Sequence, residues 1–325
     1  MQKFSKNTKM SPLLALFFGI LVVSTASVLI RGAQKEASSL VIAAYRLLIA
    51  SLILLPVVLA GHTDELRRLS KKQVLLAMVS GTFLAFHFAT WISSLEYTTV
   101  ASSVVLVSTT PLWVALLSPW VLHERSSRLV VVGMAIALIG GTVVGLSDTC
   151  HLSAGGLACS PITAFVQGKA FLGDLLALAG ALSASVYLLV GRGLRPKISL
   201  VVYIFSVYSI AAIVLVVMAL ISGQPVIGFS PITYLFLVLL AVGPQLMGHT
   251  AYNYGLGYLP AALVAVAMLG EPVGSTILAL ILLKEIPNLL EIAGGVLILV
   301  GIYLASRGQS TPVDLKKEEV IDEPL

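Results

Sequence analysis

Residues 270–306, GEPVGSTILALILLKEIPNLLEIAGGVLILVGIYLAS, decide the fold of this chain, because a second copy of them occurs earlier in the sequence. They form two apolar segments joined by a short polar link. Residues 109–145, TTPLWVALLSPWVLHERSSRLVVVGMAIALIGGTVVG, repeat this pattern without a gap. The matched positions, each offset by 161 residues, are Pro111 with Pro272, Glu124 with Glu285, Gly133 with Gly294 and Gly140 with Gly301. The chain is therefore one unit written twice.

The composition indicates a membrane protein. Of 325 residues, 58% are hydrophobic and 11% are charged, whereas average soluble domains carry about 25% charged residues. The apolar residues form long runs, close to the roughly 20 residues that a helix needs to cross a bilayer. The net charge of +5 comes without a basic patch interleaved with aromatics, so we expect the lipid bilayer as a partner and no nucleic acid.

The apolar runs and their polar flanks predict an all-α integral membrane protein with ten transmembrane helices. The expected spans are residues 12–30, 40–60, 74–95, 100–122, 129–146, 171–190, 200–221, 232–255, 261–283 and 289–306. Residues 12–147 form the first five-helix repeat and residues 171–306 the second. Residues 148–170, rich in Gly, Ser and Pro, form an irregular external linker. Residues 307–325 form a polar cytoplasmic tail whose composition indicates disorder.

The distribution of Lys and Arg predicts the orientation in the membrane. With the N-terminus in the cytoplasm, 15 of the 20 basic residues fall in inner segments. The outer segments hold four, which are Arg31, Lys35, Lys169 and Lys284. The positive-inside rule therefore places both termini of this multi-pass protein in the cytoplasm. Because five is odd, the two repeats enter the cytoplasmic membrane with opposite orientations, and such inverted repeats are typical of secondary transporters.

The repeats resemble the EamA domain of the drug/metabolite transporter superfamily. The resemblance rests on Pro111 with Glu124, on Glu271-Pro272 with Glu285, and on the glycines that follow each pair. Residues 173–177, GDLLA, and the Tyr45-Arg46 pair also fit this family. The resemblance covers about residues 12–306. It implies ten helices, a central cavity and movement of small solutes, often as efflux, and the family includes exporters of amino acids.

Polar side chains inside two spans predict where a solute binds. Gln245, His249 and Asn253 recur every fourth residue, so they share one face of a helix. His87 and Trp91 have the same spacing in the third span, and Trp91 matches Tyr252 in the repeat register. The alternatives are a polar seam between helices and ordinary aromatic packing. The full set of expected substrate-binding residues is Arg46, His87, Trp91, Gln245, His249, Tyr252, Asn253 and Glu271.

Two charged residues lie inside spans, where they require a partner or a route to water. Glu271 precedes the helix-loosening Pro272, near the middle of the ninth span. It either carries a proton during transport or acts as a structural group at the helix break. Arg46 either holds an anionic group of a solute, pairs with a carboxylate, or reaches toward the outer surface. Proton coupling is therefore one reading of the sequence, and a purely structural role is the other.

Other residue patterns limit the function further. Cys150 and Cys159 share the external linker, where a disulfide would persist; two free thiols are the alternative. The chain has no GxxxxGK[ST], HExxH, CxxC or GxSxG motif, so we expect no ATP hydrolysis, no metal, no cofactor and no enzyme activity.

We therefore interpret the sequence as a secondary transporter of small polar or amphipathic metabolites such as amino acids, with export favoured by the resemblance. The alternative is a scaffold or regulatory membrane protein that keeps the fold without moving a solute. A scaffold has no need for Gln245, His249, Asn253 and Glu271 together, so these residues discriminate between the two readings.

Overall fold

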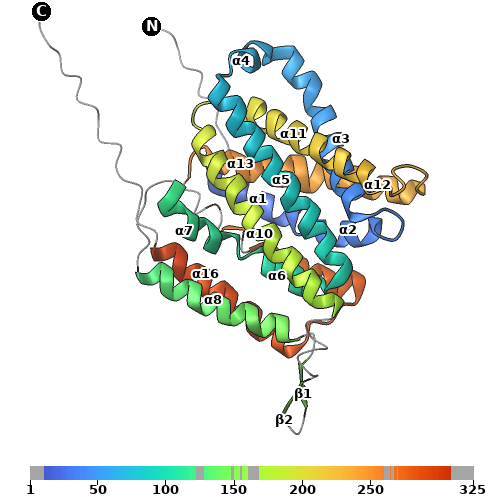
Figure 1. The fold of residues 1–325 in the computed structure, drawn as a ribbon, viewed down its shortest axis with the longest axis vertical. Coiled ribbons are helices and arrows are strands. Elements are labelled where there is room, and N and C mark those ends of the chain that lie inside the picture. The colour runs from blue at the N-terminus through green and yellow to red at the C-terminus, as the bar shows by residue number, and fades with distance from the viewer. Residues whose placement is uncertain are drawn as a thin grey trace, which may run out of the picture.

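The computed structural model describes residues 11–121, 128–147, 150–153, 156–159, 168–259, 264, 267–268 and 270–308. Glu124 and the tail after residue 308 lie outside these ranges. The helices are α1 Pro12–Val23, α2 Ala26–Ala33, α3 Ser39–Gly61, α4 Thr63–Arg67, α5 Lys71–Tyr97, α6 Val100–Val107, α7 Thr110–Val121, α8 Arg128–Ser147, α10 Lys169–Leu194, α11 Leu200–Ile221, α12 Pro231–Leu240, η1 Ala241–His249, α13 Thr250–Leu256, α15 Gly270–Leu278, η2 Ala279–Leu283 and α16 Leu289–Gly308 (Figure 1).

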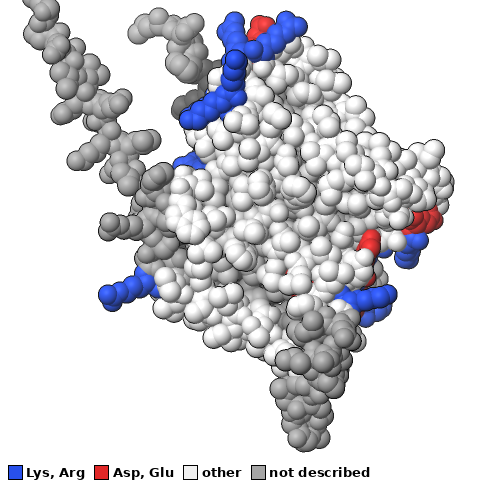
Figure 2. Space-filling view, viewed as in Figure 1, with Lys and Arg blue, Asp and Glu red and all other residues white. Residues whose placement is uncertain are grey.

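These helices confirm the predicted class of fold. Within the described residues, seven helical stretches are long and apolar enough to cross a membrane, and three shorter apolar helices accompany them. The surface of the protein exposes many large apolar side chains, such as Leu59, Leu138 and Ile281. Figure 2 shows one broad face almost free of charge, with Lys and Arg gathered over α4 at one end. An apolar belt between charged ends is what a bilayer requires, and the chain is a multi-pass membrane protein.

The equivalent helices α8 and α16 lie side by side in opposite directions (Figure 1). A methyl group on Gly140 would lie 2.7 Å from the carbonyl oxygen of Gly294, and one on Gly301 would lie 2.5 Å from that of Gly133. The offset of 161 residues converts the first contact into the second. A pseudo-two-fold axis therefore relates the matched positions of the two repeats in space, and the two repeats are inverted.

A second pair of contacts follows the same symmetry. Gly180 of α10 lies against Thr90 of α5, and the equivalent Gly19 of α1 lies against Ala251 of α13. The first span of each repeat thus packs on the third span of the other. Glycine permits this close approach because it has no side chain. Contacts between the repeats therefore bury the polar faces of the third and eighth spans.

Carboxylates in short connecting helices, at helix ends and in loops accept hydrogen bonds from the amides that begin other helices. Ser39 donates from its amide to Glu96, Val100 to Glu285, Ser199 to Glu65 and Ser230 to Glu36. Helix N-termini have unpaired N–H groups and a partial positive charge, so an acidic side chain stabilises them. The hydrogen bond from Ser230 lowers the pKa of the Glu36 carboxyl. These hydrogen bonds hold each acidic residue against the N-terminus of a helix that is distant in the sequence.

The fourth span breaks where the sequence places Pro111. The α6 helix ends at Val107 and α7 begins at Thr110. The hydroxyls of Ser108, Thr109 and Thr110 donate to the carbonyls of Val104, Leu106 and Val107, at 2.6 to 2.8 Å. Side-chain hydroxyls thus satisfy backbone groups around the break, as hydrocarbon surroundings demand.

Part of the linker between the repeats has regular structure, which corrects the expectation from its composition. Strands β1 (Cys150–Ser153) and β2 (Gly156–Cys159) form an antiparallel hairpin in which Cys150 pairs with Cys159. Cys150 is disulfide-bonded. Two residues separate the strands, which is the commonest length for a hairpin connection. Pairing between strands outweighs the weak strand propensity of a Gly- and Ser-rich segment.

Candidate functional site

Both repeats contribute to a buried cavity in the interior of the described helices. Its lining residues are His87, Trp91, Val107, Ser108, Thr110, Pro111, Ala184, His249, Met268 and Glu271. These come from α5, α6, the break between α6 and α7, α7, α10, η1, the segment that leads into α15, and α15 itself. The cavity volume is about 30 Å³, which is room for about one water molecule. The third, fourth, eighth and ninth spans therefore meet at one point, where a polar group has access to several side chains.

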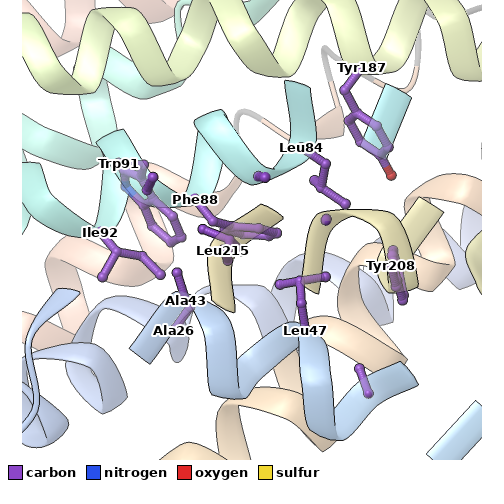
Figure 3. Packing of buried hydrophobic residues seen from close by; sticks show 14 of the residues in the cluster. Ala26, Ala43, Leu47, Leu84, Phe88, Trp91, Ile92, Tyr187, Tyr208 and Leu215 are labelled. Carbon is purple, nitrogen blue, oxygen red and sulfur yellow. The ribbon is translucent and has the colours of Figure 1, made fainter. Parts of the chain in front are cut away.

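The wall from α5 carries His87 and Trp91, whose rings are stacked with centroids 5.9 Å apart. His87 Nδ1 lies 3.0 Å from the carbonyl oxygen of Gly180. This contact fixes the imidazole because the carbonyl accepts a hydrogen bond only from the tautomer protonated at Nδ1. Figure 3 shows Trp91 and Phe88 extending from α5 into the packed interior. The α5 wall is thus an ordered aromatic surface.

The opposite wall comes from a segment that is a π-helix, η1, and not the α-helix that the spacing predicts. Pro244 lies inside it and cannot donate to the carbonyl four residues earlier, so the helix widens there. His249 ends this segment, with its ring 6.3 Å from that of His87 and 5.1 Å from that of Phe88. The third and eighth spans therefore face each other, with one imidazole on each wall.

Asn253 is one turn beyond His249, but the structure does not bring it to the cavity. Its side-chain oxygen accepts from the hydroxyl of Tyr187 at 2.6 Å, and its Nδ2 donates to the hydroxyl of Tyr208 at 3.2 Å. All three side chains are buried. This network joins α10, α11 and α13 as an interhelical polar seam. The sequence did not single out Tyr187 and Tyr208, because nothing in their spacing marks them as partners of an amide.

Arg46 lies in α3 and is completely buried. Its Nε donates to Gln245 Oε1 at 2.8 Å, and its guanidinium carbon lies 4.2 Å from the centre of the Phe88 ring. The cation thus rests on an aromatic face, a contact that gains strength away from water. Arg46 does not reach the outer surface. Gln245 fixes the position of this cation and does not line the cavity.

Glu271 is in the first turn of α15 and lines the cavity, with 8% of its surface exposed. Arg46 and Tyr252 both interact with it electrostatically. No ion pair within 4.0 Å joins Glu271 to Arg46 among the residues that the structure describes. The site therefore has a carboxyl group in the cavity wall and a guanidinium group nearby that interact electrostatically without an ion pair.

The cavity also includes residues that the sequence did not single out as ligands. Ser108 and Thr110 line it beside Pro111, and Met268 lines it beside Glu271. The prolines that break the fourth and ninth spans were the available signal, since a broken helix in a membrane is tolerated where it lines a cavity. Ser108 and Thr110 lie within three residues of Pro111, whereas Met268 lies four residues before Pro272.

A larger hollow of about 420 Å³ lies between α6, α7, α8 and α10, lined mainly by Leu, Met, Phe and Trp side chains. Its rim includes Leu116, Leu138 and Leu175, which are exposed on the apolar surface. The hollow therefore opens toward the bilayer, and Asp174 is the acidic residue in its lining. Among the described residues, no three His, Cys, Asp or Glu side chains are grouped as a metal site requires.

The inverted repeats, the broken helices and the buried polar cavity define the architecture of a secondary transporter. The sequence profile of the EamA-like transporter family matches residues 10–146 and 171–307. The chain therefore belongs to the EamA-like transporter family, as the sequence resemblance predicted, and it is a transporter and not an enzyme.

Relatives support this placement. An uncharacterized transporter of Archaeoglobus fulgidus is 27% identical over 314 residues, which cover 93% of this chain and 99% of the relative. The uncharacterized transporter YetK of Bacillus subtilis is 24% identical over 80% of this chain and 76% of its own length. A protein of known crystal structure shares the fold with a TM-score of 0.64 and 21% identity, over 93% of this chain and 98% of the other.

Proposed function

We propose that this transporter moves small polar or amphipathic metabolites such as amino acids, that export is its direction, and that both termini are cytoplasmic. The observation that carries the proposal is the central cavity, which combines two imidazoles, an indole and a carboxylate from both repeats. Such a lining offers hydrogen bonds and aromatic faces to a compact solute. A multiply charged phosphate would require several fixed cations.

The size of the cavity supports alternating access. Pockets that hold a ligand typically measure 300–1,000 Å³, against about 30 Å³ here. A solute therefore requires the repeats at residues 12–147 and 171–306 to move apart. Inverted repeats achieve this by rocking about a fixed site, first toward one side of the membrane and then toward the other.

A transport assay in proteoliposomes tests the proposal. The purified protein is reconstituted, and exchange of a panel of labelled amino acids and nucleosides is measured with and without a pH gradient. Trp91→Ala and His249→Ala should each lower transport about tenfold or more while the melting temperature stays near that of the wild type. Trp120→Ala is the matched control, because Trp120 is 75% exposed and lies away from the cavity.

Failure of the whole panel with folded protein would favour the second reading, a non-transporting scaffold with the same fold. Normal transport by both cavity variants would reject this cavity as the binding site. The same vesicles report the direction of transport. Cysteine labelling shows which way the protein is inserted, so uptake or release of solute can be assigned to import or export.

Proton coupling is the part of the proposal that rests on Glu271. Glu271 lines the cavity and interacts electrostatically with Arg46. Gain or loss of a proton by its carboxyl group therefore changes the charge of the cavity. Glu271→Gln keeps the shape and removes this titration. A folded variant that transports without any response to a pH gradient supports the carrier role, and a variant whose response is unchanged contradicts it.

A further inference from the structure

Several buried N–H and O–H groups around Arg46 have no acceptor among the described residues. They are Arg46 Nη1 and Nη2, Trp91 Nε1 and the hydroxyl of Tyr252. Gln245 Nε2 also has no partner within hydrogen-bond distance, but it interacts with the hydroxyl of Tyr208. Each of these side chains is 2% exposed or less. A buried donor without an acceptor has lost its hydrogen bond to water and gained none in return. A cluster of such donors therefore indicates that this part of the protein binds an acceptor.

The contacts in the site fix this cluster. Gln245 accepts from Arg46 Nε and so sets the direction of the guanidinium fork. The guanidinium lies over the face of the Phe88 ring, and the same ring contacts both Trp91 and His249. Trp91 and His249 line the cavity. Arg46 therefore lies one layer of side chains behind the cavity wall and is already oriented.

The charge of the cluster selects the chemistry of the acceptor. Arg46 is a fixed cation, and its two outer nitrogens form a planar fork that matches the two oxygens of a carboxylate. Glu271 interacts with it electrostatically, but it forms no ion pair with Arg46 within 4.0 Å in the described structure. Arg46 supplies one positive charge to this cluster. That charge neutralises a singly charged anion but leaves a dianion with one uncompensated negative charge.

We propose that Arg46, held in place by Gln245, forms with Trp91 and Tyr252 the subsite for the carboxylate group of the transported solute. The inference rests on the proposed function, because it names one group of the solute that the central cavity handles. It places the carboxylate on Arg46 and leaves Glu271 opposite for a positively charged amine. The apolar part of the solute then lies against Trp91 and Met268.

Acetate tests this subsite without knowledge of the natural solute. The chain has three tryptophans, so Trp113→Phe with Trp120→Phe leaves Trp91 as the only one. This protein, in lipid nanodiscs at constant ionic strength, is titrated with sodium acetate, and Trp91 emission is recorded. Acetamide, which has the same shape without the charge, is the control. We expect a saturable response to acetate and none to acetamide.

Substitutions in the same background assign the response to Arg46. Arg46→Gln should weaken apparent acetate affinity about tenfold or more, and Arg46→Lys should weaken it less because the charge remains. Arg192→Gln is the matched control and should change nothing, since Arg192 donates to the carbonyl of Leu256 away from the cluster. Tyr252→Phe removes one O–H donor and should weaken binding several-fold, which keeps the test decisive if Arg46→Gln does not fold.

Three outcomes overturn the proposal: no saturable acetate response, an equal response to acetamide, or wild-type affinity in a folded Arg46→Gln protein. The measurement is independent of transport. Acetate binding without any transport would leave the subsite standing and remove the proposed function. Transport of neutral solutes without acetate binding would do the reverse.

Discussion

Arg31 Nη2 lies 3.2 Å from Glu285 Oε1, and this ion pair joins the first repeat to the second. Arg31 also donates to the carbonyl of Thr98, while Glu285 accepts from the amide of Val100. The pair thus links α2, the start of α6 and the turn after η2. Glu285 is the carboxylate that the sequence repeat marks together with Pro272, so a residue found by pattern has a defined contact between repeats.

A double-mutant cycle should measure this contact. Both side chains are about one-quarter exposed, and exposed ion pairs contribute about 0.2–1 kcal/mol. Arg31→Gln and Glu285→Gln should therefore show a coupling free energy in that range, from thermal unfolding in detergent. A coupling near zero would mean that Glu285 acts through the amide of Val100 and not through Arg31.

The glycine contacts between α8 and α16 predict that alanine substitutions at the neighbouring positions 140 and 141 have very different effects on stability. Gly140→Ala places a methyl group 2.7 Å from the Gly294 oxygen. The helices must then separate, and overpacking of this kind costs about 1–3 kcal/mol. Gly141→Ala is the control, because the nearest atom to its methyl group is Leu106 Cδ2 at 3.8 Å. Thermal unfolding compares the two, and equal stabilities would contradict the packing.

Asn253 should behave as a structural residue. Asn253→Ala leaves the hydroxyls of Tyr187 and Tyr208 without their amide partner in a buried seam. A loss of about 1–3 kcal/mol of stability is expected for such a change, seen as a lower melting temperature. His249→Ala has no comparable network to break. A well-folded Asn253→Ala protein that fails only in transport would assign Asn253 to the solute instead.

The positive-inside rule predicts the side of the membrane on which α4 lies. Position 68 is exposed just after this helix. In a background without native cysteines, Arg68→Cys should resist an impermeant thiol reagent in intact cells and react after the membrane is opened. Lys35→Cys, exposed on an outer segment in this topology, should react at once. The reverse pattern would invert the orientation.

The hairpin in the linker predicts one disulfide. Cys150 is disulfide-bonded and Cys159 is its register partner. Under denaturing, non-reducing conditions, protein from an oxidising compartment should show no reactive thiol. Two thiols per chain would contradict the pairing. Because the disulfide closes a loop within the hairpin alone, its stabilising effect should be local to the hairpin.

The amino-acid sequence by itself determined the spans, the repeat and its inversion, because these depend on lengths of apolar chain and on the positions of Pro, Glu and Gly. It also indicated that Glu271, His87, Trp91 and His249 matter, since polar groups in hydrocarbon require a purpose. Only the tertiary structure decided their roles. Gln245, His249 and Asn253 share one stripe, yet they contact a cation, a cavity and a tyrosine seam respectively. The partner of a buried polar group comes from distant helices, and periodicity along one helix carries no information about what packs against it.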